Sequence, residues 1–414
     1  MSLLLKNRGA MLLLMLNLFL VFTGIGLVIP ILPKFMEELG VTGSIVGLLV
    51  AAFAFTQLIF SPIAGRLSDS FGRKRMIVLG MLVFALSEWL FGIATSPVLL
   101  FVSRMLGGVS GALIMPAVMA YSADVTKKEE RATGMGFINA SITTGFIIGP
   151  GIGGYIAEFG LRVPFYSAAV AGLLAAAVTA IVLPESVRVT EEEEEKEEGD
   201  ENTAPTSDAP AKRGFFSQLL YSYREPYFLS LIIVFVMSFG LANYETLFGL
   251  FVDHKFGFTT KDIAFIITFG SIAGAVIQVT AFGWIMSRFG ETRVIFTSLL
   301  SASVFVLLTL FVHKYWLIFA VTFLVFLATD ILRPAISTQM SMLAKEQQGY
   351  VAGLNSAFTS LGNIVGPIVA GFLFDININY PYALAALILL LGSALVLRAS
   401  SKTAKRRATV PSAE

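Results

Sequence analysis

Long apolar runs, separated by short polar or charged segments, dominate the pattern of this sequence from end to end. Runs long enough to cross a bilayer, about 20 residues each, begin near residues 11, 44, 76, 98, 134, 163, 228, 262, 294, 315, 350 and 380. The pattern therefore predicts twelve membrane-spanning helices. The first run follows Lys6 and Arg8 but extends to Pro30 without a small-residue cleavage site, so we interpret it as a retained helix.

One polar segment is much longer than the others and divides the twelve runs six and six. Residues 185–214 read ESVRVTEEEEEKEEGDENTAPTSDAPAKRG, an acidic stretch that cannot bury a core. We predict a six-helix bundle over residues 1–184, a largely disordered cytoplasmic linker over 185–226, a second six-helix bundle over 227–398 and a basic cytoplasmic tail over 399–414. Such an acidic run is usually a solvated linker, and binding of a partner is the alternative.

The two halves contain matching segments, which indicates an internal repeat. TTGFIIGPGIGG at residues 143–154 matches SLGNIVGPIVAG at residues 360–371, an offset of 217 positions. GRLSDSFGRKRMI after the second run matches GWIMSRFGETRVI after the eighth at an offset of 218. Parallel repeats of six spans predict a pseudo-twofold axis along the membrane normal and a site between the halves near the midplane.

Glycines on one face of the fifth run predict a close helix contact. Gly145, Gly149 and Gly153 are four residues apart, which places a smooth strip on one helix face, and Pro150 adds a bend beside it. We expect this strip to form a sliding contact between the two halves. The same letters contain a GxGxxG pattern that ends at Gly154, but no strand precedes it, so we reject a dinucleotide site.

Composition favours an integral membrane protein and excludes several kinds of site. Of 414 residues, 56% are hydrophobic and 14% are charged, which is far too apolar for a soluble chain of this size. The chain has no cysteine, and His254 and His313 fall in predicted loops, so we expect no metal site. A net charge of +1 gives no indication of a nucleic-acid partner. Without HExxH, P-loop or GxSxG motifs, we expect neither an enzyme nor a cofactor.

Basic residues indicate the orientation, because Lys and Arg accumulate in cytoplasmic loops. With both termini in the cytoplasm, most of the 29 lysines and arginines fall in cytoplasmic segments. Those predicted for external loops are Lys34, Arg162, Lys255, Lys261 and Lys314.

Five ionisable residues fall well inside predicted spans: Glu88, Arg104, Glu245, Asp330 and Arg333. Each costs about 2.5 to 3.5 kcal/mol on insertion scales, so each marks a candidate functional site. Asp330 and Arg333 share a helix face and form either a structural pair or part of a proton path. For Arg104 the alternative is hydrogen bonding that fixes the first bundle, and for Glu88 it is exposure to water near the outer half of its span.

Glu245 gives the sharpest signal, because its own span contains no basic residue that could pair with it. Burial of a lone carboxylate favours its protonated form, so such a group can take up and release a proton at working pH. A membrane-permeant cation can occupy the same position, attracted by roughly 4 kcal/mol at about 4 Å and an effective dielectric near 20. Proton and cation then exclude each other, and that exclusion is antiport.

Apolar, aromatic and amide side chains recur at helical spacing around these charges. They are Phe22, Ile25, Ile29, Phe53, Gln57, Phe146 and Phe326. A stripe of Phe in a membrane helix is more often packing than a ligand site, and the chain contains 36 Phe, so spacing alone does not select these residues.

These motifs together resemble the major facilitator superfamily, and within it the twelve-span drug:proton antiporters. GRLSDSFGRKR is similar to the loop signature of the superfamily, RMLGGVSGA to its span-four motif, and GFINASITTGFIIGPGIGG to the span-five antiporter signature. The likeness to the Gram-positive multidrug efflux proteins of the NorA and Bmr group extends over nearly the whole chain. It includes TGIGLVIPILP, SFGLANYETL, DILRPAI and GLNSAFTSLGNIVGP, whereas the long acidic linker departs from the pattern.

The resemblance implies an all-α integral membrane protein with the major facilitator fold, built from two pseudo-twofold-related six-helix bundles. It implies a monomer in the bacterial cytoplasmic membrane, without a cofactor, that uses the proton gradient to export drugs. Those drugs are hydrophobic and often cationic or zwitterionic, such as fluoroquinolones, dyes and quaternary ammonium compounds.

The resemblance also implies roles for individual residues. The proton-coupling residues are Glu245, Asp330, Arg333 and Arg104. The substrate-binding residues are Phe22, Ile25, Phe53, Gln57, Phe146, Glu245, Phe326, Asp330 and Asn363. The gating residues are Gly65, Asp69, Gly72, Arg73, Gly145, Gly149, Pro150, Gly153 and Gly154, with the cluster from Arg73 to Arg75 steadying the cytoplasmic gate between the halves.

Two alternatives stay open. A proton symporter or facilitator of the same fold would import a small metabolite and would need a more hydrophilic cavity than the aromatic residues suggest. A non-transporting membrane scaffold would act through its acidic linker.

Overall fold

A computed structural model of the chain describes residues 2–126, 130–185, 227–344 and 348–408. Within these residues, twelve helices are long and apolar enough to cross a membrane. They begin within a few residues of the predicted positions, so the prediction of twelve spans is confirmed. The predicted linker, apart from Glu185, and the last six residues of the predicted tail lie outside the described residues.

The spans form two groups of six in chain order. The first half contains α1 (Ser2–Leu39), α2 (Gly43–Phe71), α3 (Arg73–Gly92), α4 (Pro97–Val125), α5 (Arg131–Ile156), the 3-10 helix η1 (Ala157–Phe159) and α6 (Val163–Val182). The second half contains α8 (Phe228–Phe256), α9 (Thr260–Thr280), the short helix α10 (Phe282–Phe289), α11 (Glu291–Leu308), α12 (Tyr315–Ala344), α13 (Gln348–Ile376) and α14 (Tyr380–Ala408).

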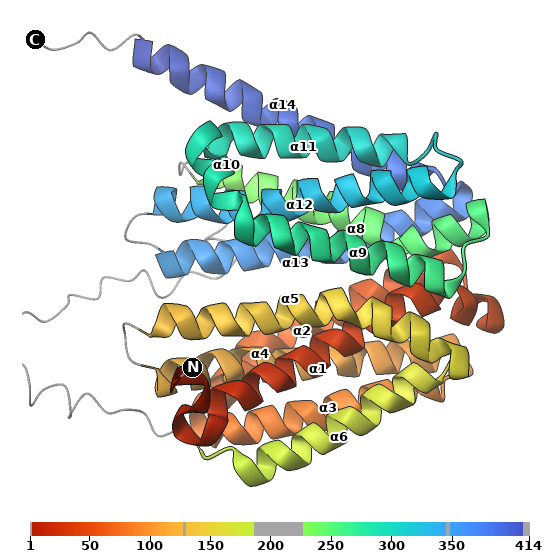
Figure 1. Cartoon of the computed structure of the whole chain (residues 1–414), viewed down its shortest axis with the longest axis vertical. Helices are drawn as coiled ribbons and strands as arrows, with labels where there is room; N and C mark the ends of the chain where they lie inside the picture. Colours follow the sequence, from red (N-terminus) through yellow and green to blue (C-terminus); the bar gives the residue numbers. More distant parts are fainter. Residues whose placement is uncertain (1, 127–129, 186–226, 345–347, 409–414) are drawn as a thin grey trace, which may run out of the picture.

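The two groups form two bundles that lie side by side (Figure 1). We call the end where α1 begins and α14 ends the terminus side, and the end where α1 ends and α14 begins the far side. The bundles contact each other mainly through α2 with α13 and through α5 with α9. Within the bundles, α1 packs on α5 and α8 packs on α13, at equivalent positions in the two halves.

The glycine strip of α5 fits against α1 in its own half. A Cβ atom on Gly149 would lie 2.7 Å from the Thr23 carbonyl oxygen, and one on Gly145 would lie 2.7 Å from the Phe19 carbonyl oxygen. Gly153 meets Leu27 of α1 in the same way. The prediction that this strip contacts the other half is therefore wrong. The strip serves close packing inside the first bundle, where small residues let two helix backbones approach.

The second half repeats this packing at equivalent positions. A Cβ atom on Gly362 would lie 2.6 Å from the Ser238 Cβ atom, and one on Gly366 would lie 2.9 Å from the Phe239 carbonyl oxygen of α8. Pro150 and Pro367 both lie inside helices that continue past them. The repeated sequence therefore builds the same helix pair in each half.

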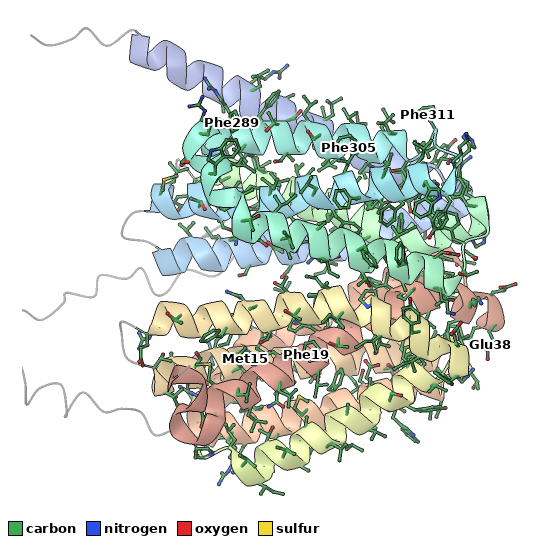
Figure 2. The ribbon with its side chains drawn as sticks, in the orientation of Figure 1. Met15, Phe19, Glu38, Phe289, Phe305 and Phe311 are labelled. Atoms are coloured by element: carbon green, nitrogen blue, oxygen red, sulfur yellow. The ribbon has the colours of Figure 1, made fainter. Side chains whose placement is uncertain are left out.

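Large apolar side chains cover the outer surface of both bundles. Ile181 is 82% exposed, Val98 is 72% exposed and Phe311 is 68% exposed. Figure 2 shows the labelled Phe311 and Glu38 at the far side, one in each half, and Phe289 at the terminus side. A soluble protein rarely exposes so much apolar surface, whereas the hydrocarbon of a bilayer accommodates it.

The contact between α1 and α5 leads to a stability prediction. Gly149→Val places a branched side chain against the α1 backbone, so we expect a loss of about 1 to 3 kcal/mol in the free energy of unfolding. Gly136→Val on the same helix is the matched control, because a Cβ atom there meets nothing within 4 Å. Melting curves of the purified protein in detergent measure the difference, and equal melting temperatures for the two variants would contradict the packing role.

Candidate functional site

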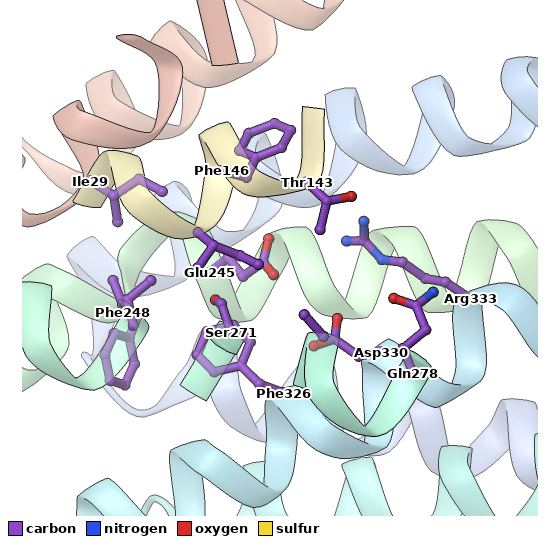
Figure 3. Close-up of a pocket in the computed structure, with 13 residues that line it drawn as sticks. Ile29, Thr143, Phe146, Glu245, Phe248, Ser271, Gln278, Phe326, Asp330 and Arg333 are labelled. Atoms are coloured by element: carbon purple, nitrogen blue, oxygen red, sulfur yellow. The ribbon is translucent and has the colours of Figure 1, made fainter. Parts of the chain in front are cut away.

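A cavity of about 280 Å³ lies between the two halves. Helices α1 and α5 form its wall in the first half, and α8, α9 and α12 form its wall in the second (Figure 3). Its lining consists of Ile29, Thr143, Phe146, Ile147, Glu245, Phe248, Ile267, Ser271, Ala275, Gln278, Phe326, Asp330 and Arg333. The cavity therefore lies where the internal repeat predicts a site, between the bundles.

Three charged side chains from the second half face this cavity. They are Glu245 of α8 and Asp330 and Arg333 of α12. Arg333 acts electrostatically on both carboxylates, and the carboxylates act on each other. Within the described part of the chain, none of the three is in an ion pair or a side-chain hydrogen bond. Figure 3 shows the Arg333 guanidinium and the Asp330 carboxyl group pointing in different directions.

The positions of these side chains distinguish between the two explanations of the charges on α12, a structural pair and part of a proton path. A structural pair would bring Asp330 and Arg333 together, as their spacing on one helix face allows. They do not form an ion pair, and each group keeps free hydrogen-bonding capacity at the cavity. Unsatisfied charges in an apolar bundle are costly unless water or a ligand reaches them, so the geometry favours a functional role.

Two glycines of α9 make room for the side chains of α12. A Cβ atom on Gly274 would collide with the carboxylate of Asp330, and one on Gly270 would lie 2.8 Å from the Phe326 ring. Because these glycines are four residues apart, they lie on the same helix face. The close approach of α9 to α12 thus sets the position of the Asp330 carboxylate in the cavity.

Aromatic rings form much of the remaining wall. The Phe146 ring is 41% exposed and packs on Phe22 of α1, with ring centroids 4.8 Å apart. Phe326 meets Tyr244 edge to face at 6.5 Å, and Phe248 lies one helical turn beyond Tyr244 on α8. The cavity therefore combines polarisable apolar surfaces with two carboxylates and one guanidinium.

The structure brings only part of the predicted substrate set to this cavity. Of that set, Phe146, Glu245, Phe326 and Asp330 line it. Arg333, predicted for proton coupling, and Ile29 line it as well. The predicted residues outside its lining are Phe22, Ile25, Phe53, Gln57 and Asn363.

Packing inside the first half explains most of these absences. Phe22 lies behind Phe146, and Phe53 and Gln57 of α2 pack against glycines of α4. A Cβ atom on Gly107 would lie 3.2 Å from the Phe53 ring, and one on Gly111 would lie 2.9 Å from the Gln57 amide nitrogen. These side chains do not line the cavity that contains Glu245 in this conformation, and their part in substrate binding stays a prediction.

Sequence reasoning missed the contribution of α9. Ser271 and Gln278 line the cavity and are seven residues apart, which places them on one helix face. Two polar residues at this spacing in a mostly apolar span indicate a polar helix face, and that pattern could have predicted both of them. The other lining residues missed were Thr143, Ile147, Phe248, Ile267 and Ala275, and nothing in their spacing distinguishes them from packing residues.

Glu88 and Arg104 form a separate buried site in the first half. Glu88 is only 5% exposed, so the suggestion that it faces water is wrong. Its Oε2 atom has no hydrogen-bond partner among the described residues, and its charge interacts with that of Arg104. The Arg104 guanidinium lies 4.5 Å from the centre of the Phe91 ring, a cation–π contact. Neither residue lines the cavity, and the part of Arg104 in proton coupling stays a prediction.

Among the described residues, the ion pairs of the predicted gating cluster lie within its own half. Arg73 pairs with Asp69, and its Nε atom lies 3.3 Å from the Asp124 carboxylate of α4. Gly72 separates α2 from α3 with a φ of 99°, a value that favours glycine. A Cβ atom on Gly65 would meet nothing within 4 Å. A gate formed by these residues between the halves is therefore absent from this part of the described structure and stays a prediction for another state.

Comparison with known proteins now assigns the family. The model of the Major Facilitator Superfamily matches residues 14–281 and 230–414. This chain belongs to that superfamily. It is 47% identical over 392 residues to "Multidrug resistance protein 2" of Bacillus subtilis (strain 168), covering 95% of both chains. It is 40% identical over 390 residues to "Quinolone resistance protein NorA" of Staphylococcus aureus (strain COL), covering 94% of this chain and 96% of that one.

Solved structures agree with the major facilitator fold. The inward-facing, occupied structure of a bacterial homolog to the human lysosomal transporter Spinster superimposes with a TM-score of 0.75 at 14% identity. That likeness covers 94% of this chain and 96% of the other. The peptide transporter POT gives a TM-score of 0.73 at 17% identity over 95% and 94% of the chains. The predicted fold is confirmed, and the family is one of membrane transporters rather than enzymes.

The geometry of the cavity predicts how an introduced thiol would react. Gln278 is exposed in the cavity and lies towards the terminus side of α9, so Gln278→Cys should react there with a water-soluble maleimide. Leu173→Cys on the outer face of α6 is the control, because lipid surrounds that position and thiolates form readily only in contact with water. We expect labelling of Gln278→Cys to be at least about tenfold faster.

The measurement benefits from a chain that contains no cysteine of its own. Labelling from the terminus side and from the far side is compared in vesicles of both orientations. Equal rates at the two positions, or labelling of position 278 from the far side only, would contradict the geometry of the cavity.

Proposed function

We propose that this protein is a proton-coupled antiporter that exports hydrophobic, cationic or zwitterionic drugs. Its relatives are named for multidrug resistance and for quinolone resistance, at 47% and 40% identity over nearly the whole chain. The observation that carries the proposal is two carboxylates, Glu245 and Asp330, that line an aromatic cavity between the two halves and form no ion pair with any described residue. Fluoroquinolones, dyes and quaternary ammonium compounds have the matching chemistry.

The cavity fits such substrates in three ways. The rings of Phe146, Phe248 and Phe326 offer apolar and π surfaces to a planar drug. A drug cation at about 4 Å from Glu245 or Asp330 gains roughly 4 kcal/mol at an effective dielectric near 20. Arg333 offers a donor to the carboxylate of a zwitterion. A fluoroquinolone carries both charges and can use both ends of the cavity.

The antiport step follows from competition for the same carboxylates. A protonated Glu245 or Asp330 carries no charge, so it loses its attraction for a drug cation. Arg333 acts electrostatically on both carboxylates and favours the charged state that receives the drug. Protons that enter from one side therefore release a drug that has entered from the other.

The direction of transport rests on the orientation that the basic residues predict. With the terminus side in the cytoplasm, the far side faces the exterior, and there Gly47 meets Pro367 and Gly154 meets Ala264 of the other half. The exposed cavity residues Gln278 and Arg333 lie towards the terminus side, where a drug would enter from the cytoplasm or the inner leaflet. We assign the protein to the bacterial cytoplasmic membrane, with both termini inside, as a monomer.

Drug-driven proton movement tests the proposal directly. Everted vesicles with an acid interior receive ethidium, a quaternary ammonium compound or norfloxacin while a fluorescent probe reports the pH gradient. We expect proton release from the wild type and a reduction of at least about tenfold in Glu245→Gln and Asp330→Asn, because each variant removes a cation-attracting charge. Asp253→Asn, on α8 but outside the cavity lining, is the control and should retain the wild-type signal.

Two results would contradict this function. Wild-type vesicles that show no proton release with a broad drug panel, while they carry a small metabolite downhill, would indicate a facilitator or symporter. Full activity of the double variant with both carboxylates replaced would remove Glu245 and Asp330 from the coupling mechanism.

The glycine behind Asp330 gives an independent prediction. Gly274→Ala forces the Asp330 carboxylate to move, so we expect transport of ethidium to fall about tenfold while the protein stays folded. Gly353→Ala on α13 is the matched control, since a Cβ atom there meets nothing within 4 Å. Efflux rates in vesicles, with melting curves on the same samples, separate a transport defect from unfolding. Equal rates for the two variants would show that the position of this carboxylate is not critical.

A further inference from the structure

Asp375, at the end of α13 in the second half, accepts hydrogen bonds from the first residues of α2 in the first half. Its Oδ1 atom accepts a hydrogen bond from the Gly43 backbone N–H at 2.7 Å. Its Oδ2 atom accepts one from the Ser44 backbone N–H at 2.9 Å and a second from the Ser44 hydroxyl group. One carboxylate thus satisfies two of the free N–H groups at the start of α2, and its charge complements the positive end of that helix.

The start of α2 needs this carboxylate because α2 has no cap of its own. Its N-cap residue, Thr42, makes no side-chain cap hydrogen bond. The equivalent residue of α9, Thr259, forms a capping box with Asp262. The position in α2 that corresponds to Asp262, at the repeat offset of 217, is the apolar Ile45. The α9 helix is therefore capped within its own half, whereas α2 receives its cap from the other half.

The repeat places a second contact at the symmetry-related position. Glu158, in η1 after α5, forms an ion pair with Lys261 in the first turn of α9. Glu158 precedes Asp375 by 217 positions, and Lys261 follows Ser44 by the same number. Each half therefore presents a carboxylate from the end of its fifth span to the start of the second span of the other half.

Matching glycines bring the helices close enough for these contacts. Gly371 of α13 faces the backbone of Gly43, and Gly154 of α5 faces the Thr260 carbonyl oxygen and the Ala264 side chain of α9. These two glycines are also 217 positions apart. Of the predicted gating glycines on α5, Gly154 thus does lie between the halves. A side chain at either position would separate the two helices and the polar contacts beyond them.

We propose that Asp375 and Glu158 form a two-point clasp that holds the far side closed, with Asp375 as the stronger point. Opening of the far side has to break both contacts and leaves the start of α2 without a cap. The Glu158 and Lys261 side chains are each about half exposed, so their ion pair contributes little and is readily reversed. The clasp sets the balance between two conformations without touching the substrate cavity. As a gate of alternating access, it rests on the proposed transport function.

A distance measurement across the far side tests the clasp. Spin labels are placed on Val98→Cys and Phe311→Cys, two exposed far-side positions in opposite halves, in the full cysteine-free chain in lipid nanodiscs. Electron–electron double resonance then gives the ratio of open to closed far sides. Asp375→Asn turns an amide donor towards one of the two N–H groups, so we expect this ratio to rise about tenfold, as for loss of a helix cap.

The second point of the clasp gives a smaller expected change. Glu158→Gln should raise the ratio of open to closed far sides about twofold. The charge-reversed pair Glu158→Lys with Lys261→Glu should restore the wild-type ratio, because it rebuilds the ion pair in the opposite sense. Failure of the reversed pair to restore the ratio, when Glu158→Gln has raised it, would remove this contact from the clasp.

Asp262→Asn is the matched control for Asp375→Asn. It makes the same chemical change at a helix start on the far side, but its cap lies within one half, so the ratio should not change. A wild-type ratio in Asp375→Asn would overturn the clasp, and so would an equal rise in Asp262→Asn. Drug-driven proton movement by the wild type with ethidium is measured on the same purified protein after reconstitution into vesicles. Its absence would contradict the transport function, whereas unchanged distances in an exchanging protein would contradict the clasp alone.

Discussion

Contact between helix backbones at glycine is the interaction on which the rest of the structure depends. Hydrocarbon solvates apolar side chains as well as a protein core does, so membrane helices associate through close packing at small residues. Gly149 against Thr23 and Gly366 against Phe239 join α1 to α5 and α8 to α13 in the same way. Glycines also join the two halves, since Gly47 of α2 meets the Pro367 carbonyl oxygen and Gly371 of α13 meets the Gly43 carbonyl oxygen. Close packing at small residues therefore builds both the bundles and the contact between them.

The charge of the cavity is divided unequally between the two halves. Glu245, Asp330 and Arg333 all belong to the second half, whereas the first half contributes Phe146 and other uncharged side chains. In the proposed transport cycle, competition between a proton and a drug cation takes place on a single half, so the geometry of its charges is preserved when the halves rock. The first half would then act as a wall that covers or uncovers these charges.

The candidate site was predictable where chemistry alone identifies a residue. Glu245 and Asp330 are conspicuous in the sequence because a carboxylate in an apolar span costs free energy to insert and therefore indicates a function. Phe53 and Gln57 were not predictable in the same way, because an aromatic or amide side chain fits a packing contact as well as a binding site. The structure places both against glycines of α4, and it adds Ser271 and Gln278 from α9. Which face of a helix meets the cavity depends on partners that are distant in sequence.

The sequence by itself determined the twelve spans, the repeat and the charges that lie within the membrane, since the length and polarity of a span are properties of a continuous stretch. The tertiary structure decided which helix each glycine strip faces and which charges stay unpaired, because the rotation of each helix follows from its neighbours. The N-terminal cap of α2 is the clearest case. It comes from Asp375, 331 positions beyond Ser44, and only the fold brings the two together.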